Sequence, residues 1–243
     1  MAPVCRIWNS SRHELIFAWG VESLDEAIIV RLNKTVAFPR FYPILDKATL
    51  DARGISVSSV AEEMARAGVR VLQYRDKLGS PEEVLRGSAV ISEVFADRYC
   101  VLILNDRPDL ALLAGWPGVH VGHEDMNPCD ARKVMGAGAI IGVSTHSDEQ
   151  MIAADAGCAD YVAVGPVFRT SSKADAEPVV GLEGVRRARA LTKKPLVAIG
   201  GITRENARSV LDAGADSVAV IGGLLVKGEQ PGKVAKDFLE ILG

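Results

Sequence analysis

The sequence has no long hydrophobic run, no basic stripe and no cysteine motif. The apolar run at 15–20 is far too short for a signal-peptide core, and no segment approaches the ~18 apolar residues that a membrane span needs. The net charge of −3, without a basic stripe, argues against nucleic acid as a partner. The four cysteines, Cys5, Cys100, Cys129 and Cys158, form no CxxC pair and no metal-binding cluster with histidine. We therefore expect reduced thiols and a cytoplasmic location.

What the chain does have, from about Arg40 onward, is a regular alternation of apolar, β-branched segments with helical ones. Its 243 residues, of which 48% are hydrophobic, suit one barrel-sized domain with a single large core. Apolar segments of this kind are typical of parallel strands that are buried on both faces. We predict strands at 41–45, 69–74, 101–104, 119–121, 140–143, 161–164, 196–199 and 218–221.

A helical segment follows each predicted strand. Ser80, Asn127 and Thr203 are placed to cap three of these helices. The predicted helices are 57–67, 81–95, 108–113, 128–135, 148–156, 182–191, 203–213 and 234–242. This pattern predicts an α/β protein with a (β/α)8 TIM barrel, and a doubly wound parallel sheet is the alternative.

Residues 1–38 do not share this rhythm. Residues 24–30 could form one short helix, but the rest has no clear period. An additional helix, a loose arm and translation from too early a start are all compatible with the sequence. We therefore divide the chain into an N-terminal extension of unknown role, 1–38, and a catalytic barrel, 39–243.

Two of the predicted strands end in the same pair of glycines. The strand at 196–199 leads into Gly200-Gly201, and the strand at 218–221 leads into Gly222-Gly223. Glycine leaves the backbone N–H groups open to an anion, because no Cβ shields them. In a (β/α)8 barrel these loops follow the seventh and eighth strands, a frequent phosphate site. The pairs therefore predict a phosphate-binding cup, and the alternative is that they only form tight loops.

Polar side chains accumulate where the predicted strands end, which is the face on which barrel enzymes have their active sites. Asp106 and Asp125 end neighbouring strands, about 4.8 Å apart, and can share one Mg²⁺ whose other positions go to water and phosphate. Arg75, Lys77 and Lys173 add positive charge at the same mouth. The pattern predicts a magnesium-dependent site for phosphorylated small molecules. For each residue alone a structural role is the alternative, such as an Arg75–Asp106 ion pair.

Two histidines near the predicted mouth are interpreted differently. His120 lies within a strand and is interpreted as a hydrogen-bonded core residue. His146 lies closer to the mouth and could act as an acid–base group, so its role stays open.

The polar stretches at the predicted strand ends, taken in their order along the chain, resemble those of the thiamine phosphate synthase family. The likeness runs from about Arg40 to the C-terminus, and its combination of motifs is specific. The matching stretches are 73–77 (QYRDK), 105–111 (NDRPDLA), 118–125 (GVHVGHED), 142–146 (GVSTH), 160–173 and 199–202 (IGGI). The resemblance implies an enzyme that joins hydroxymethylpyrimidine diphosphate to a thiazole phosphate.

The resemblance also implies roles for particular residues. Asp106 and Asp125 would hold Mg²⁺. Arg75, Lys77, Ser144 and Lys173 would be catalytic. The pyrimidine diphosphate would contact Gln73, Arg75, Lys77, Asn105, Ser144 and Lys173. The thiazole phosphate would contact Thr170, Ser172 and the backbone at Gly201, Ile221 and Gly222.

The chain departs from the family pattern at several positions. Gly222 stands where serine is usual, which removes a side-chain donor from the phosphate cup and leaves its affinity for the thiazole open. His123 stands where glutamine is usual, close to the proposed metal ligand Asp125. Tyr74 stands where leucine is usual, and Ser172 stands where threonine is usual.

Rival functions are a thiazole tautomerase that uses His146, a non-catalytic phosphate-sensing paralogue and a sugar-phosphate epimerase. The presence of Asp106, Asp125, Lys77 and Lys173 together favours the synthase. A homo-oligomer is possible, because the sequence carries no signal for or against one.

Overall fold

The computed structural model describes residues 5–9, 14–18, 38–170 and 178–243, and the chain divides into two units, Met1–Ala37 and Phe38–Gly243. In the first unit β1 (Cys5–Asn9) and β2 (Glu14–Ala18) form an antiparallel pair, which the sequence did not predict. The predicted helix at 24–30 lies outside the described residues. Phe38 is grouped with the barrel, whereas the sequence had placed it in the extension.

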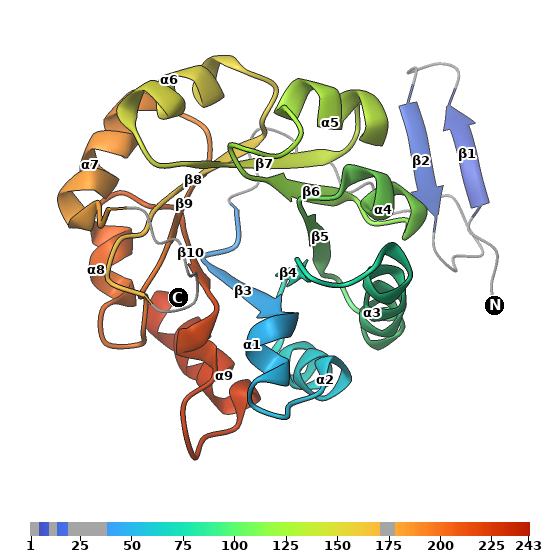
Figure 1. The fold of residues 1–243 in the computed structure, drawn as a ribbon, viewed down its shortest axis with the longest axis horizontal. Coiled ribbons are helices and arrows are strands. Elements are labelled where there is room, and N and C mark those ends of the chain that lie inside the picture. The colour runs from blue at the N-terminus through green and yellow to red at the C-terminus, as the bar shows by residue number, and fades with distance from the viewer. Residues whose placement is uncertain (1–4, 10–13, 19–37, 171–177) are drawn as a thin grey trace. The chain divides into compact units, whose positions relative to one another are not determined.

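The second unit is a closed barrel of eight parallel strands with helices around it, so the predicted (β/α)8 fold is confirmed (Figure 1). β10 pairs with β3, with Val218 opposite Phe41, and this pairing closes the barrel. The strands are β3 (Phe41–Asp46), β4 (Val71–Arg75), β5 (Val101–Asn105), β6 (Gly118–Val121), β7 (Ile140–Thr145), β8 (Tyr161–Val164), β9 (Leu196–Ile199) and β10 (Ser217–Val220).

The helices begin mostly where the capping residues predict. Ser80 forms a capping box with Glu83, and the Asn127 side chain accepts a hydrogen bond from the amide of Cys129. The helices are α1 (Lys47–Asp51), α2 (Val57–Ala67), α3 (Pro81–Val94), α4 (Pro108–Leu113), α5 (Pro128–Met135), α6 (Asp148–Ala156), α7 (Gly181–Leu191), α8 (Ala207–Asp212) and α9 (Pro231–Leu242), and η2 (Gly222–Leu224) is a 3₁₀ turn.

Three helices differ from the prediction by more than one residue. α9 begins at Pro231, three residues before the predicted start at 234. The short α1 was not predicted, and it forms because the Asp46 side chain caps it by accepting from the amide of Thr49. α8 begins at Ala207 and has no side-chain cap, so the assignment of Thr203 as its cap was wrong. The amide of Thr203 instead donates to the side chain of Asn206, which holds the preceding residues in a turn.

Buried side chains form two layers, because neighbouring residues of a strand point to opposite sides. Leu72 and Tyr74 belong to the layer between strands and helices. The barrel interior holds Tyr42, Tyr161 and other apolar side chains. Phe38 packs 4.9 Å from the ring of Tyr161, near the ends at which the strands begin, so it covers that end of the interior.

Cys129 and Cys158 form a disulfide, which corrects the expectation that all the cysteines are reduced. They are 29 residues apart in sequence, but their Cα atoms lie 5.0 Å apart. The disulfide joins the first turn of α5 to the turn after α6, two segments that only the barrel brings together. Cys100 is a free thiol, and burial raises its pKa to about 12.

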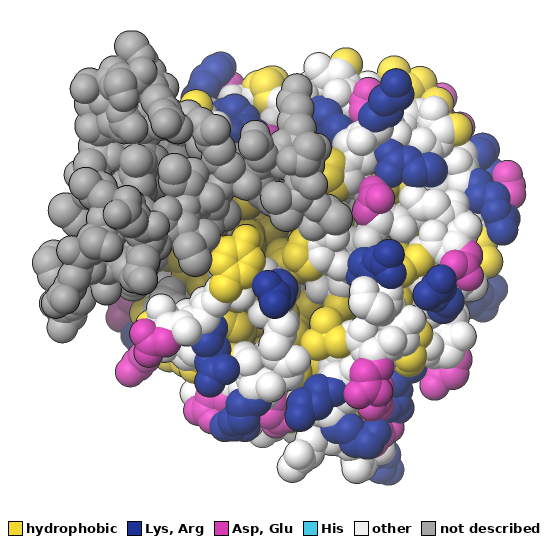
Figure 2. Space-filling view, turned by 180° about the vertical axis from the view of Figure 1, so that it is seen from behind, with side chains coloured by type: hydrophobic (Ala, Val, Ile, Leu, Met, Phe, Trp, Pro, Cys, Tyr) yellow, Lys and Arg dark blue, Asp and Glu magenta, His cyan; other side chains and the backbone are white. Residues whose placement is uncertain are grey.

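On the face shown in Figure 2, Lys and Arg side chains lie scattered among Asp and Glu. This mixed surface fits the net charge of −3. Within the described residues, no helix has the length and apolar character needed to cross a membrane.

Candidate active site

A cavity opens among the C-terminal ends of the barrel strands, and it collects predicted site residues from four of them. Gln73 and Arg75 come from β4, Asn105 from β5 and Ser144 from β7, and Ile221 follows β10. The full lining is Tyr42, Ile44, Gln73, Arg75, Asn105, His120, Ser144, Ala163, Val197, Ile199, Ala219 and Ile221. The cavity therefore joins an apolar floor to a polar rim.

Arg75 is held by Asp46, which the sequence did not single out. The Asp46 carboxylate, 3% exposed, contacts Arg75 Nη1 and also accepts from the backbone and side chain of Thr49. The predicted alternative of an Arg75–Asp106 pair was wrong. The signal for Asp46 was its position directly after the predicted strand 41–45, at the C-terminal end where barrel strands carry functional side chains.

Asp106 and Asp125 face one another at the ends of β5 and β6. The backbone N–H of Asp106 donates to the carbonyl oxygen of His120 at 2.7 Å, which places Asp106 against β6. Burial, then the hydrogen bond and charge of Asp125, raise the pKa of Asp106 to about 6, while Lys77 opposes the shift. Lys77 Nζ lies 3.3 Å from Asp106 Oδ2.

The backbone of Asp106 is itself unusual. Its φ of 62° lies in the left-handed region, which residues other than glycine enter infrequently. Asp125 is oriented by the amide of Gly122, which donates to its Oδ2 at 2.8 Å. Two carboxylates held this close suit a shared cation.

These two carboxylates fit Mg²⁺ better than a metal enclosed by protein ligands. In the part of the chain that the structure describes, no group of three or more His, Cys, Asp or Glu side chains could hold a metal ion. Mg²⁺ is usually bound by one or two carboxylates, with phosphate and water completing its shell. The pair therefore suits a cation whose coordination the substrate completes.

The two Gly-Gly loops pack tightly against neighbouring backbone. A Cβ on Gly201, whose φ is 63°, would lie 2.4 Å from the carbonyl oxygen of Arg169, and one on Gly223 would lie 2.3 Å from that of Ile202. Close packing therefore accounts for these glycines. Among the described residues, none accepts a hydrogen bond from the amides of Gly222 and Gly223, so these amides are also available to an anion.

The two histidines differ in their surroundings. His120 is buried, as predicted, with Nε2 2.9 Å from Ser144 Oγ and Nδ1 2.9 Å from the hydroxyl of Tyr161. Its contact with Ser144 was not predicted, because the sequence does not show which strand residues share the interior.

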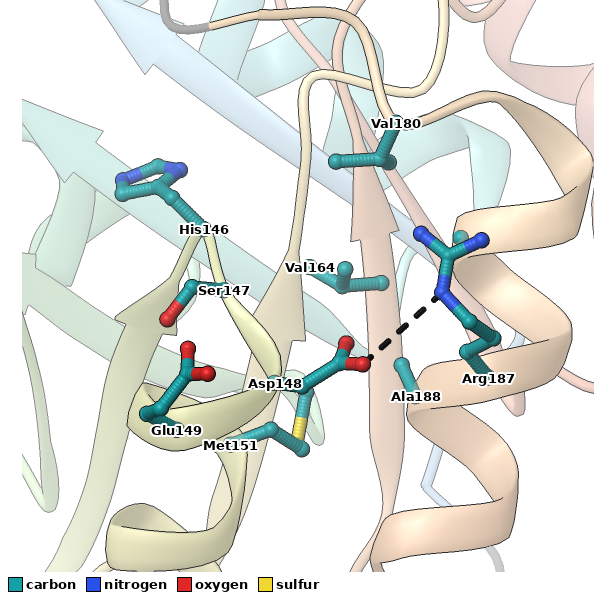
Figure 3. Close-up of a pocket in the computed structure, with 10 residues that line it drawn as sticks. His146, Ser147, Asp148, Glu149, Met151, Val164, Val180, Arg187 and Ala188 are labelled. Carbon is teal, nitrogen blue, oxygen red and sulfur yellow. Dashed lines mark ion pairs between the residues drawn. The ribbon is translucent and has the colours of Figure 1, made fainter.

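His146 lines a separate cavity of about 280 Å³ beside α6 and α7. Its Nδ1 lies 2.6 Å from the carbonyl oxygen of Gly165. Figure 3 shows its ring turned away from the ion pair between Asp148 and Arg187.

Ser172 and Lys173 lie outside the described residues. Thr170 is described and lies on the loop after β8, and Gly201 and Gly222 lie on the loops after β9 and β10.

Comparison with known proteins gives a consistent result. Residues 41–224 match the family described as thiamine monophosphate synthase. The thiamine-phosphate synthase of Koribacter versatilis is 48% identical over 206 residues, which cover 84% of this chain and 96% of that protein. The thiamine-phosphate synthase of Methanosarcina mazei is 38% identical over 202 residues, which cover 83% of this chain and 82% of that protein.

Solved structures agree with the sequence matches. The thiamine phosphate pyrophosphorylase of Pyrococcus furiosus superposes with a TM-score of 0.73 at 32% identity, covering 84% of this chain and 95% of that one. The shared barrel, the matched span and these identities show that the chain belongs to the thiamine monophosphate synthase family.

Proposed function

We propose that this chain joins hydroxymethylpyrimidine diphosphate to a thiazole phosphate, which yields thiamine phosphate and diphosphate. As a family member, the chain is a transferase of thiamine biosynthesis. The observation that carries the proposal is the mouth itself, where Lys77 pairs with Asp106, Asp106 interacts with Asp125, and Arg75 is held by Asp46. Such a site suits a substrate with a polyanionic leaving group.

The proposed reaction exchanges one bond for another. The C–O bond between the pyrimidine methylene and the diphosphate breaks, and its electron pair leaves with the diphosphate. The thiazole nitrogen then donates its lone pair to the cationic methylene carbon, forming the C–N bond. Arg75 and Lys77 would stabilise the charge that grows on the departing diphosphate, as pre-organised charges do most effectively.

Asp106 and Asp125 would hold Mg²⁺ in this scheme. When bound, Mg²⁺ neutralises part of the negative charge on the diphosphate. Lys77 forms an ion pair with Asp106, so its ammonium group lies on the side of the mouth where Mg²⁺ would be held. The thiazole phosphate would occupy the cup formed by the backbone at Gly201, Ile221 and Gly222, together with Thr170 and Ser172.

The direct test is to mix the purified chain with both substrates and Mg²⁺, and to measure thiamine phosphate by chromatography. Product that depends on both substrates and disappears in EDTA supports the proposal. Conversion of the thiazole phosphate alone, with or without EDTA, would instead identify a tautomerase. Binding of phosphate compounds without turnover would identify a non-catalytic, phosphate-sensing paralogue.

A pair of variants separates the two enzymes residue by residue. The family resemblance implies that Lys173 contacts the leaving diphosphate, so in a synthase Lys173→Ala should lower kcat by about 10²–10³. His146→Ala should cost much less, because no proton transfer is needed to release diphosphate. A tautomerase predicts the reverse order, so an inactive histidine variant beside a fully active lysine variant contradicts the synthase.

A further inference from the structure

A chain of hydrogen bonds crosses the barrel interior and connects two residues of the mouth. Gln73 Nε2 donates to the Tyr42 hydroxyl at 2.9 Å, and the hydroxyls of Tyr42 and Tyr161 lie 3.0 Å apart. The Tyr161 hydroxyl lies 2.9 Å from His120 Nδ1, and His120 Nε2 lies 2.9 Å from Ser144 Oγ. The chain thus begins and ends at residues that line the active-site cavity.

The amide nitrogen of Gln73 gives this chain a direction, because it can donate hydrogen bonds and cannot accept them. Tyr42 accepts from Gln73, and the Tyr161 hydroxyl, 3.0 Å away, is the acceptor within reach of its own proton. Because a buried hydroxyl proton without a partner is costly, the Tyr42 proton is assigned to this bond. Tyr161 then accepts from Tyr42 and donates its own hydroxyl proton in the hydrogen bond to His120 Nδ1. That nitrogen is therefore the acceptor of a neutral ring, and the proton of His120 is on Nε2.

The surroundings keep the chain in this state. Burial raises the pKa of Tyr42 and of Tyr161 above their usual values, so both phenols retain the protons they donate. Phe38 packs against both tyrosine rings, with centroid distances of 5.7 Å and 4.9 Å. The hydroxyl groups of Tyr42 and Tyr161 are therefore shielded from water, which could otherwise offer them other hydrogen-bond partners.

We propose that Tyr42 and Tyr161 are positioning residues that act through His120: they hold its ring as the neutral Nε2–H tautomer, which donates to Ser144 Oγ. The Ser144 hydroxyl then has its own proton left for a ligand in the cavity, and Gln73 has its carbonyl oxygen left as an acceptor. The hydrogen-bond pattern at these two points of the cavity is thus set from within the barrel. The ligand is taken to be the pyrimidine diphosphate, and to that extent the inference rests on the proposed function.

The tautomer is tested directly on the full chain, without substrates. Labelling with ¹⁵N-histidine gives a simple spectrum, since the sequence has four histidines, and His120→Asn assigns the resonance of interest. Two-bond ¹⁵N–¹H correlation distinguishes the protonated from the unprotonated ring nitrogen. A proton on Nε2 supports the proposal, whereas a neutral ring protonated on Nδ1, or a charged ring at neutral pH, overturns it.

Kinetics test the positioning role with a matched control. Tyr161→Phe removes a hydroxyl of the chain and keeps the buried ring, and Tyr74→Phe makes the same change in a buried tyrosine outside the chain. Loss of one oriented hydrogen bond should raise the KM for the pyrimidine diphosphate about tenfold in Tyr161→Phe. The KM for the thiazole phosphate should stay unchanged, and Tyr74→Phe should change neither.

Equal effects of the two tyrosine variants, or equal changes in both KM values, would overturn the positioning role. If Tyr161→Phe does not fold, Tyr42→Phe interrupts the chain one step earlier and is expected to give the same split. Failure of the proposed function is recognised separately, because the tautomer measurement needs no substrate. A protein that lacks synthase activity can still have His120 protonated on Nε2.

Discussion

Asp46 is the residue on which the position of Arg75 depends. It is 3% exposed and pairs with a guanidinium that is itself largely buried. Removing one member of a buried ion pair leaves the other charge unpaired, which is strongly destabilising. Asp46→Ala should therefore lower the free energy of unfolding by about 3–5 kcal/mol, measured in urea. It should also raise the KM for the pyrimidine diphosphate, because Arg75 loses its support.

Asp51→Ala is the control for this change. Asp51 pairs with Lys47 on the same short helix, but both side chains are exposed, so its loss should cost only about 0–1 kcal/mol. If the two variants are equally stable, the Asp46–Arg75 pair does not support the mouth.

The carboxylate pair gives a second prediction at single residues. Asp106→Asn and Asp125→Asn each remove a ligand charge for Mg²⁺, and each should lower kcat by about 10²–10³. Higher Mg²⁺ concentration should restore part of the activity, and binding of the thiazole phosphate should persist. Asp109→Asn is the control, since Asp109 pairs with Arg107 on the surface. Full activity of the wild-type chain in EDTA would contradict the magnesium assignment.

Among the elements, the loop after β9 is the one whose shape depends most on glycine. Gly201 and Gly228 both have positive φ, at 63° and 84°, but only Gly201 has backbone in the space that a Cβ would fill. Alanine should cost about 1–2 kcal/mol of unfolding free energy at either position from backbone strain. Gly201→Ala should cost a further 1–3 kcal/mol or so from the clash.

The same pair of variants bears on the phosphate cup. Gly201→Ala displaces the loop on which the proposed thiazole phosphate site depends, and should raise the KM for that substrate in steady-state kinetics. Gly228→Ala should leave this KM unchanged. Equal KM values for the two variants would mean that the loop after β9 does not bind the phosphate.

At the scale of the whole molecule, the Cys129–Cys158 disulfide closes a loop of 29 residues. A cross-link over that length restricts the unfolded chain and should contribute about 3–4 kcal/mol of stability. The double variant Cys129→Ser, Cys158→Ser should lose that amount in urea unfolding. Thiol titration of the unfolded chain, before and after reduction, should differ by two thiols. Equal thiol counts would restore the expectation of reduced cysteines.

The boundary of the barrel gives the last prediction. Phe38 packs on Tyr42 and Tyr161, so a chain that begins at Phe38 should keep the fold and turnover of the full protein. Phe38→Ala in that shortened chain should lower the free energy of unfolding by about 3–5 kcal/mol, because it empties a core position. An inactive or insoluble shortened chain would show that residues before Phe38 contribute to the barrel.

The sequence by itself determined the barrel and the candidates for its site. Periodicity, capping residues such as Ser80 and Asn127, and turn glycines act over a few residues, so they can be read without tertiary structure. Strand ends such as Arg75 and Asn105 followed from the same pattern, since parallel strands bring their C-terminal ends to one face.

Only the tertiary structure decided which of these residues meet. Asp46 and Arg75 are 29 positions apart, His120 and Tyr161 are 41 apart, and Tyr42 and Tyr161 are 119 apart. The barrel brings each pair together through strand pairing and stagger, which depend on all eight strands at once. The disulfide and the burial of Phe38 arise in the same way. Local pattern determines what each residue can do, and closure of the barrel determines its partner.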